Sequence, residues 1–203
     1  MSTPHEPPDI ASTSAGRSAR RVTIFAICVV TALIVGMGLI IGLPALNKHE
    51  GQAQTIEALH EIDRIYKRSA QYFATPHLGP NGENLPCQFP EPQTMTPDIT
   101  NKACCGGAMD IDKDNRCDVD KGLWTSPTWT ALSFQMTESH RYGYTYQSEG
   151  VGDSSKFTAT ANGDLDCDGT LSMFQRTGLA NSAVEGKCML STQSPFTTSR
   201  ETE

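Results

Sequence analysis

Two short runs of alternating aspartates carry the residues whose type and spacing best suit metal chemistry. In one run Asp164, Asp166 and Asp168 occupy positions 1, 3 and 5 of a loop, and Gly169 follows at position 6. This D-x-D-x-D-G spacing is the one by which a loop places oxygen ligands around Ca²⁺. Gln175 stands at position 12, where a bidentate Glu is usual, so a calcium loop and a plain Asp/Gly turn both remain open. The candidate ligands are Asp164, Asp166, Asp168, Thr170 and Ser172.

The other run repeats the alternation at Asp110, Asp112 and Asp114. Lys113 and Arg116 interrupt its negative charge, and no glycine closes the loop. The run is therefore a second candidate for Ca²⁺, with an ordinary acidic surface as the alternative.

Cysteine use indicates an oxidising compartment. The chain has seven cysteines, of which Cys28 lies in an apolar stretch. The other six are Cys87, Cys104, Cys105, Cys117, Cys167 and Cys188. An even number in a small acidic domain predicts three disulfides, and the C-x-x-C spacing of a zinc site is absent. We expect the vicinal pair Cys104-Cys105 to bond to two different partners, and we expect Cys167 to pair with Cys188.

The sequence contains no motif of a known catalytic machinery. There is no G-x-S-x-G elbow, phosphate-binding loop or H-E-x-x-H pair. The formal net charge of −7 would repel phosphate groups, which argues against a nucleic-acid partner. We therefore expect a protein that is not an enzyme.

An uncharged stretch near the N-terminus predicts a membrane anchor. Residues 22–46 contain no charged side chain, and a basic cluster precedes them, within the Pro- and Ser-rich segment 1–21. Such a length of apolar chain is enough to cross a bilayer, and the positive-inside rule then places the N-terminus in the cytoplasm. The sequence thus predicts a disordered cytoplasmic tail over 1–21 and a single-pass inner-membrane protein. Pro44 would kink the membrane helix.

Residues 47–74 predict that the same helix continues outside the membrane. Apolar side chains recur there at spacings of three and four, which is typical of one face of a helix. We expect this stripe to pack on the domain that follows. Its members are Ile56, Leu59, Ile62, Tyr66 and Phe73.

The rest of the chain predicts a small antiparallel sheet. Six prolines over 75–103 favour a loop. Residues 131–136, 141–147 and 156–161 are expected to be strands, because polar and apolar side chains alternate clearly in the last two. For the first, a short turn around Trp129 is the alternative. A fourth strand would begin near Met173. The fold class is thus α+β, with a long N-terminal helix on an antiparallel sheet, a disulfide-stapled head over 75–190 and a disordered C-terminus over 191–203.

Two parts of the sequence resemble type IV pilins and their secretion-system relatives. The first runs from Leu43-Pro44-Ala45-Leu46 through Ala53-Gln54-Thr55-Ile56-Glu57-Ala58-Leu59 to Tyr66-Lys67-Arg68-Ser69-Ala70-Gln71-Tyr72-Phe73. The second runs from Trp124 through Tyr142 and Tyr144 to Phe157-Thr158-Ala159-Thr160-Ala161-Asn162-Gly163-Asp164-Leu165-Asp166, and it is similar to the heads of pilin-like proteins of the Gram-negative, myxobacterial type.

The resemblance implies a pilin-like fold and a structural role in a pilus or secretion pseudopilus. Its partners would be the inner membrane and other pilin-like subunits, contacted through the N-terminal helix. When Pro44 is matched to the proline of the pilin helix, however, Val22 stands where pilins have the leader glycine. Ile27 stands where they have the assembly glutamate, so no prepilin-peptidase site is visible. The alternative function is an anchored periplasmic or surface binding domain with calcium-stabilised acidic loops that does not enter filaments.

Overall fold

The computed structural model describes residues 28–32, 37, 54–181, 188–191 and 196–200. The chain divides into two units, Met1–Glu50 and Gly51–Glu203. The described residues of the first unit are helical and exposed. Most of the segment 22–46, with Pro44, and all of the tail 1–21 lie outside the described residues.

The predicted membrane anchor is the first correction. Across the described ranges, no helix combines the length and the apolar character needed to cross a bilayer. This finding overturns the prediction of a single-pass inner-membrane protein.

The predicted fold class, built on one long N-terminal helix, is also wrong. The helix of the second unit is described over residues 54–74 only, and the other helices described in that unit are short. Short helices in proteins are stabilised mainly by packing, and here the first fully buried side chain of the helix is Ala58.

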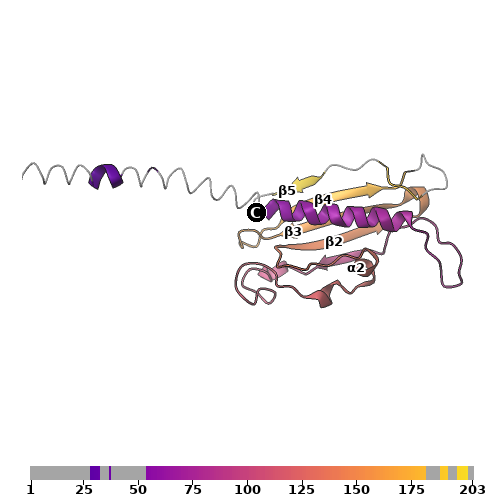
Figure 1. The fold of residues 1–203 in the computed structure, drawn as a ribbon, viewed down its shortest axis with the longest axis horizontal. Helices are drawn as coiled ribbons and strands as arrows, with labels where there is room; N and C mark the ends of the chain where they lie inside the picture. The colour runs from indigo at the N-terminus through magenta and orange to yellow at the C-terminus, as the bar shows by residue number, and fades with distance from the viewer. Residues whose placement is uncertain (1–27, 33–36, 38–53, 182–187, 192–195, 201–203) are drawn as a thin grey trace, which may run out of the picture. The chain divides into compact units, whose positions relative to one another are not determined.

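Five antiparallel strands form one sheet in the order β1-β2-β3-β4-β5, and the helix 54–74 lies across one face of it (Figure 1). The strands are β1 (Gln93–Thr96), β2 (Tyr142–Glu149), β3 (Lys156–Gly163), β4 (Ser172–Leu179) and β5 (Thr197–Ser199). Each strand follows its neighbour in sequence, so the sheet is a meander. β5 lies in the segment 191–203, for which the sequence predicted no structure.

Alternating side chains explain the three central strands, whose prediction is confirmed. Tyr142, Tyr144 and Tyr146 of β2 are all fully buried on the face that meets the helix. Opposite them on β3, Ala159 pairs with Tyr146 and Ala161 with Tyr144, so small residues make room for large rings.

The inner face of the helix 54–74 fills the space above these strands. Ile62, Tyr66 and Phe73 are at most 3% exposed, and the ring of Tyr66 lies 5.5 Å from that of Phe157 on β3. Leu59 is partly buried against the same core. Ile56 was expected in this stripe, but it is 63% exposed and points away from the core.

Two segments outside the central strands differ from the prediction. The proline-rich segment contains β1, which Pro97 follows directly; a strand is tolerated there because β1 is an edge strand. The expected strand over 131–136 is absent. The chain instead forms a short helix, α2 (Pro127–Ala131), because the Ser126 hydroxyl caps the N-terminus of this helix. The 3-10 helices are η1 (Thr100–Lys102), η2 (Lys121–Trp124) and η3 (Gly152–Ser154).

Three disulfides are present, as the cysteine count predicted. They join Cys87 to Cys188, Cys104 to Cys117 and Cys105 to Cys167. The vicinal cysteines do bond to different partners, but the expected pair Cys167–Cys188 is wrong. Cys167 bonds to Cys105 because the β3–β4 loop meets the 104–118 segment and not the C-terminal segment that contains Cys188.

Candidate metal centre

The loop between β3 and β4 is the first candidate site. Asp164 follows the last residue of β3 and is only 8% exposed. Its Oδ2 accepts a hydrogen bond from the backbone N–H of Gly169 at 3.1 Å, which folds the loop back on itself. Gly169 has a φ of +99°, a conformation that strongly favours glycine.

The other two aspartates of this loop are exposed at its outer rim. Asp166 Oδ1 accepts from the N–H of Asp168 at 3.1 Å, and Asp168 Oδ1 accepts from the N–H of Thr170 at 2.6 Å. The Thr170 N–H lowers the pKa of Asp168 below its usual range, so this carboxylate is charged at neutral pH. One oxygen from each of the three aspartates lies within 4.8 Å of the others. Ser172, in contrast, donates its hydroxyl proton to the Gly163 carbonyl at 2.8 Å between the strands.

The earlier aspartate run forms a second loop with a buried acid at its centre. Asp110 is fully buried, and its two carboxylate oxygens accept from the N–H groups of Gly106 (2.6 Å), Asp114 (3.0 Å) and Asn115 (3.1 Å). Burial alone would raise the pKa of Asp110, but these three backbone donors bring it below its usual range.

Exposed acids surround Asp110, and the positive charge of Lys113 partly offsets their negative charge. Partial loss of hydration, followed by the negative charge of Asp114, raises the pKa of Asp112. Lys113 donates to the Gly106 carbonyl at 2.7 Å. The carboxylate of Asp118 accepts from the Ile111 N–H at 2.6 Å and closes the loop. Sequence reasoning gave Asp118 no role, although it follows Asp114 at a spacing of four.

The structure brings the two acidic loops together. Cys105 lies just before the 106–118 loop and bonds to Cys167 inside the β3–β4 loop, while Cys104 bonds to Cys117 at the far end of the 106–118 loop. The ammonium group of Lys102 donates to the Cys167 carbonyl. Both candidate loops thus share one covalently linked region.

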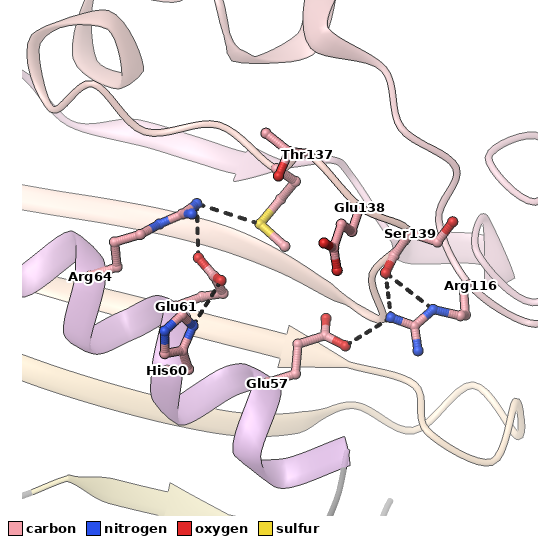
Figure 2. Close-up of a pocket in the computed structure, with 9 residues that line it drawn as sticks. Glu57, His60, Glu61, Arg64, Arg116, Thr137, Glu138 and Ser139 are labelled. Carbon is pink, nitrogen blue, oxygen red and sulfur yellow. Dashed lines mark hydrogen bonds and ion pairs between the residues drawn. The ribbon is translucent and has the colours of Figure 1, made fainter.

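A polar hollow of about 380 Å³ lies elsewhere, beside the N-terminal half of the helix 54–74 (Figure 2). Its lining residues are Glu57, His60, Glu61, Arg64, Arg116, Met136, Thr137, Glu138 and Ser139. Arg116 lies 3.3 Å from Glu57, and Arg64 lies 2.8 Å from Glu61. The sequence alone assigned no role to these charges.

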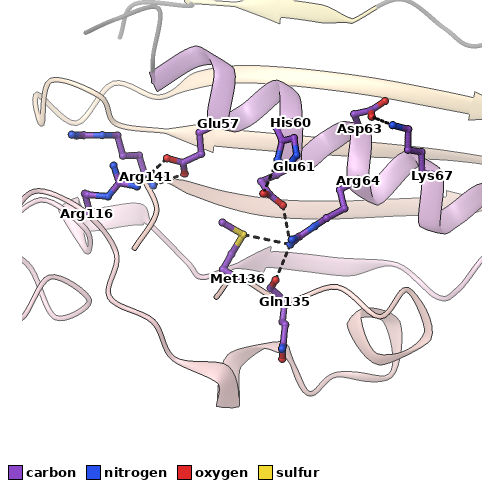
Figure 3. A network of polar contacts seen from close by, with 10 residues as sticks. All are labelled: Glu57, His60, Glu61, Asp63, Arg64, Lys67, Arg116, Gln135, Met136 and Arg141. Carbon is purple, nitrogen blue, oxygen red and sulfur yellow. Dashed lines mark hydrogen bonds and ion pairs between the residues drawn. The ribbon is translucent and has the colours of Figure 1, made fainter. Parts of the chain in front are cut away.

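The charges in the hollow connect the helix to the segment that precedes β2 (Figure 3). Glu57 accepts from the backbone N–H of Arg141 at 2.8 Å, and Arg64 donates to the Gln135 carbonyl at 2.7 Å. Burial raises the pKa of Glu57 even though the Arg141 N–H and the Arg116 charge oppose it. These carboxylates and guanidinium groups hold two parts of the fold together.

Comparison with known proteins gives no match to a family model, a curated protein or a solved structure. A functional interpretation therefore depends on the residues described above.

Proposed function

We propose that this chain is a structural subunit of the type IV pilin-like or secretion-pseudopilin kind, which acts by docking against other subunits. The observation that supports it best is the two-sided character of the helix 54–74. Its inner side chains are buried in the core, whereas its outer side chains recur at helical spacing and are exposed. The exposed side chains are Ile56, His60, Lys67, Arg68, Gln71 and Ala74.

Charge supports self-association through this outer face. The chain carries a net charge of −7, but Lys67 and the adjacent Arg68 are exposed and positive. These two positive side chains on one copy would complement acidic loops on the next, which is a head-to-tail contact. Head-to-tail contacts that do not close into a ring generate filaments.

Shearing of filaments from cells that produce the full chain tests the proposal. Lys67→Glu reverses a charge on the outer helix face, and Lys156→Glu is its matched control on β3. Each lysine is exposed and forms one surface ion pair, Lys67 with Asp63 and Lys156 with Glu149. Such pairs contribute little stability, so both variants should fold.

We expect Lys67→Glu to reduce the amount of protein in the sheared filament fraction at least about five-fold. Lys156→Glu should leave it unchanged. Absence of the unmodified protein from that fraction, or equal losses in both variants, would contradict the proposed function.

A further inference from the structure

We propose that the β3–β4 loop binds one Ca²⁺ ion through the carboxylates of Asp164, Asp166 and Asp168. Calcium binding here is a separate property from assembly, and it would hold for a subunit that never enters a filament.

The separation of the three carboxylates fits a single ion. Ca²⁺ holds its oxygen ligands at about 2.3–2.6 Å, so two oxygens on the same ion lie at most about 5 Å apart. The three aspartates offer oxygens that all lie within 4.8 Å of one another. The loop therefore needs no rearrangement larger than a side-chain adjustment to surround the ion.

A buried carboxylate oxygen without a partner points to a ligand at this loop. Asp164 is more than nine-tenths buried, and its Oδ1 has no hydrogen-bond partner among the residues that the structure describes. Its Oδ2 is already held by the Gly169 N–H. Buried polar atoms in folded proteins are nearly always satisfied, and an unpaired carboxylate oxygen is especially unfavourable. A bound cation would satisfy Asp164 Oδ1.

The buried acid of the other acidic loop has no such unpaired oxygen. Asp110 is also buried, but both of its oxygens accept backbone N–H groups. The unpaired oxygen therefore distinguishes the β3–β4 loop from a second loop of similar composition.

The donor set favours calcium over other metals. Cys167 is the only sulfur in the loop, and its disulfide with Cys105 removes it as a ligand. Oxygen-only sites suit hard cations, and Ca²⁺ accepts the irregular geometry of an exposed loop more readily than Mg²⁺ does. The nearby ammonium of Lys102 opposes binding by charge repulsion.

The melting temperature of the full chain in EDTA and in 10 mM CaCl₂ tests the site. Calcium modules of extracellular proteins have Kd values of about 10⁻⁴–10⁻³ M, so 10 mM CaCl₂ should raise Tm by about 3–10 °C. MgCl₂ at the same concentration should give a clearly smaller rise.

Two matched variants locate the ion. Asp168→Asn keeps an oxygen that can accept the Thr170 N–H, so it preserves the loop while removing one charge. It should lose most of the calcium-induced rise in Tm. Asp112→Asn makes the same change in the other loop and should keep the rise. Lys102→Met should tighten binding a few-fold.

Three results would overturn the assignment. They are no rise in Tm with 10 mM CaCl₂, a full rise in Asp168→Asn, and loss of the rise in Asp112→Asn alone.

Discussion

The same substitution at two positions of one helix measures how strongly the helix 54–74 is held by the sheet. Ile62 is fully buried in the core, whereas Ile56, six residues earlier, is 63% exposed. Replacing a buried isoleucine by alanine removes apolar contacts and leaves a cavity, which costs about 2–5 kcal/mol. At an exposed position the change is within about 0.5 kcal/mol. Alanine also has the higher helix propensity, and this contribution is the same at both sites.

We therefore expect Ile62→Ala to lower the free energy of unfolding by about 2–5 kcal/mol and Ile56→Ala to leave it nearly unchanged. For a domain of this size the first loss lowers Tm by roughly 5–15 °C. Urea unfolding followed by circular dichroism, with EDTA present throughout, measures both values. Equal losses in the two variants would refute the packing of the helix on the sheet.

Two further predictions concern the disulfides and the pH dependence of stability. Replacing both Cys105 and Cys167 by serine removes a disulfide between residues 62 positions apart and should lower the free energy of unfolding by about 4 kcal/mol. Removing the Cys104–Cys117 disulfide, which joins residues 13 positions apart, should lower it by about 3 kcal/mol. Urea unfolding measures both values, and a larger loss for the shorter link would contradict this ranking. Burial lowers the pKa of His140 to about 4. Since the unfolded state then binds the proton more readily, stability should fall by about 3 kcal/mol as pH falls from about 6.5 to 4, and His140→Gln should remove this part of the pH dependence.

The sequence predicted the strands that depend on local alternation. Tyrosines alternate with other residues at positions 142, 144 and 146 of β2, so its buried face could be recognised without knowledge of the fold. The exposure of Ile56 could not be predicted, because Ile56 fits the periodicity of the stripe and only the position of the sheet leaves it exposed. The strand expected at 131–136 was wrong because the cap at Ser126 determines the local structure.

The candidate site was predicted in part. The spacing of Asp164, Asp166 and Asp168 was visible in the sequence, and the structure brings their oxygens together. The unpaired oxygen of Asp164 could not be predicted, because it results from burial at the end of β3. The pairing of Cys105 with Cys167 likewise depends on how the β3–β4 loop meets a distant segment.

Site-specific photo-crosslinking tests docking through the outer helix face most directly. A photoreactive amino acid in place of Gln71 lies on that face, and the same amino acid in place of Val151, an exposed residue of the β2–β3 turn, is the control. Irradiation of intact cells should join the chain to a second copy, or to another pilin-like subunit, from position 71 and not from position 151. Monomers alone at both positions, or equal cross-linking from both, would contradict assembly through this helix.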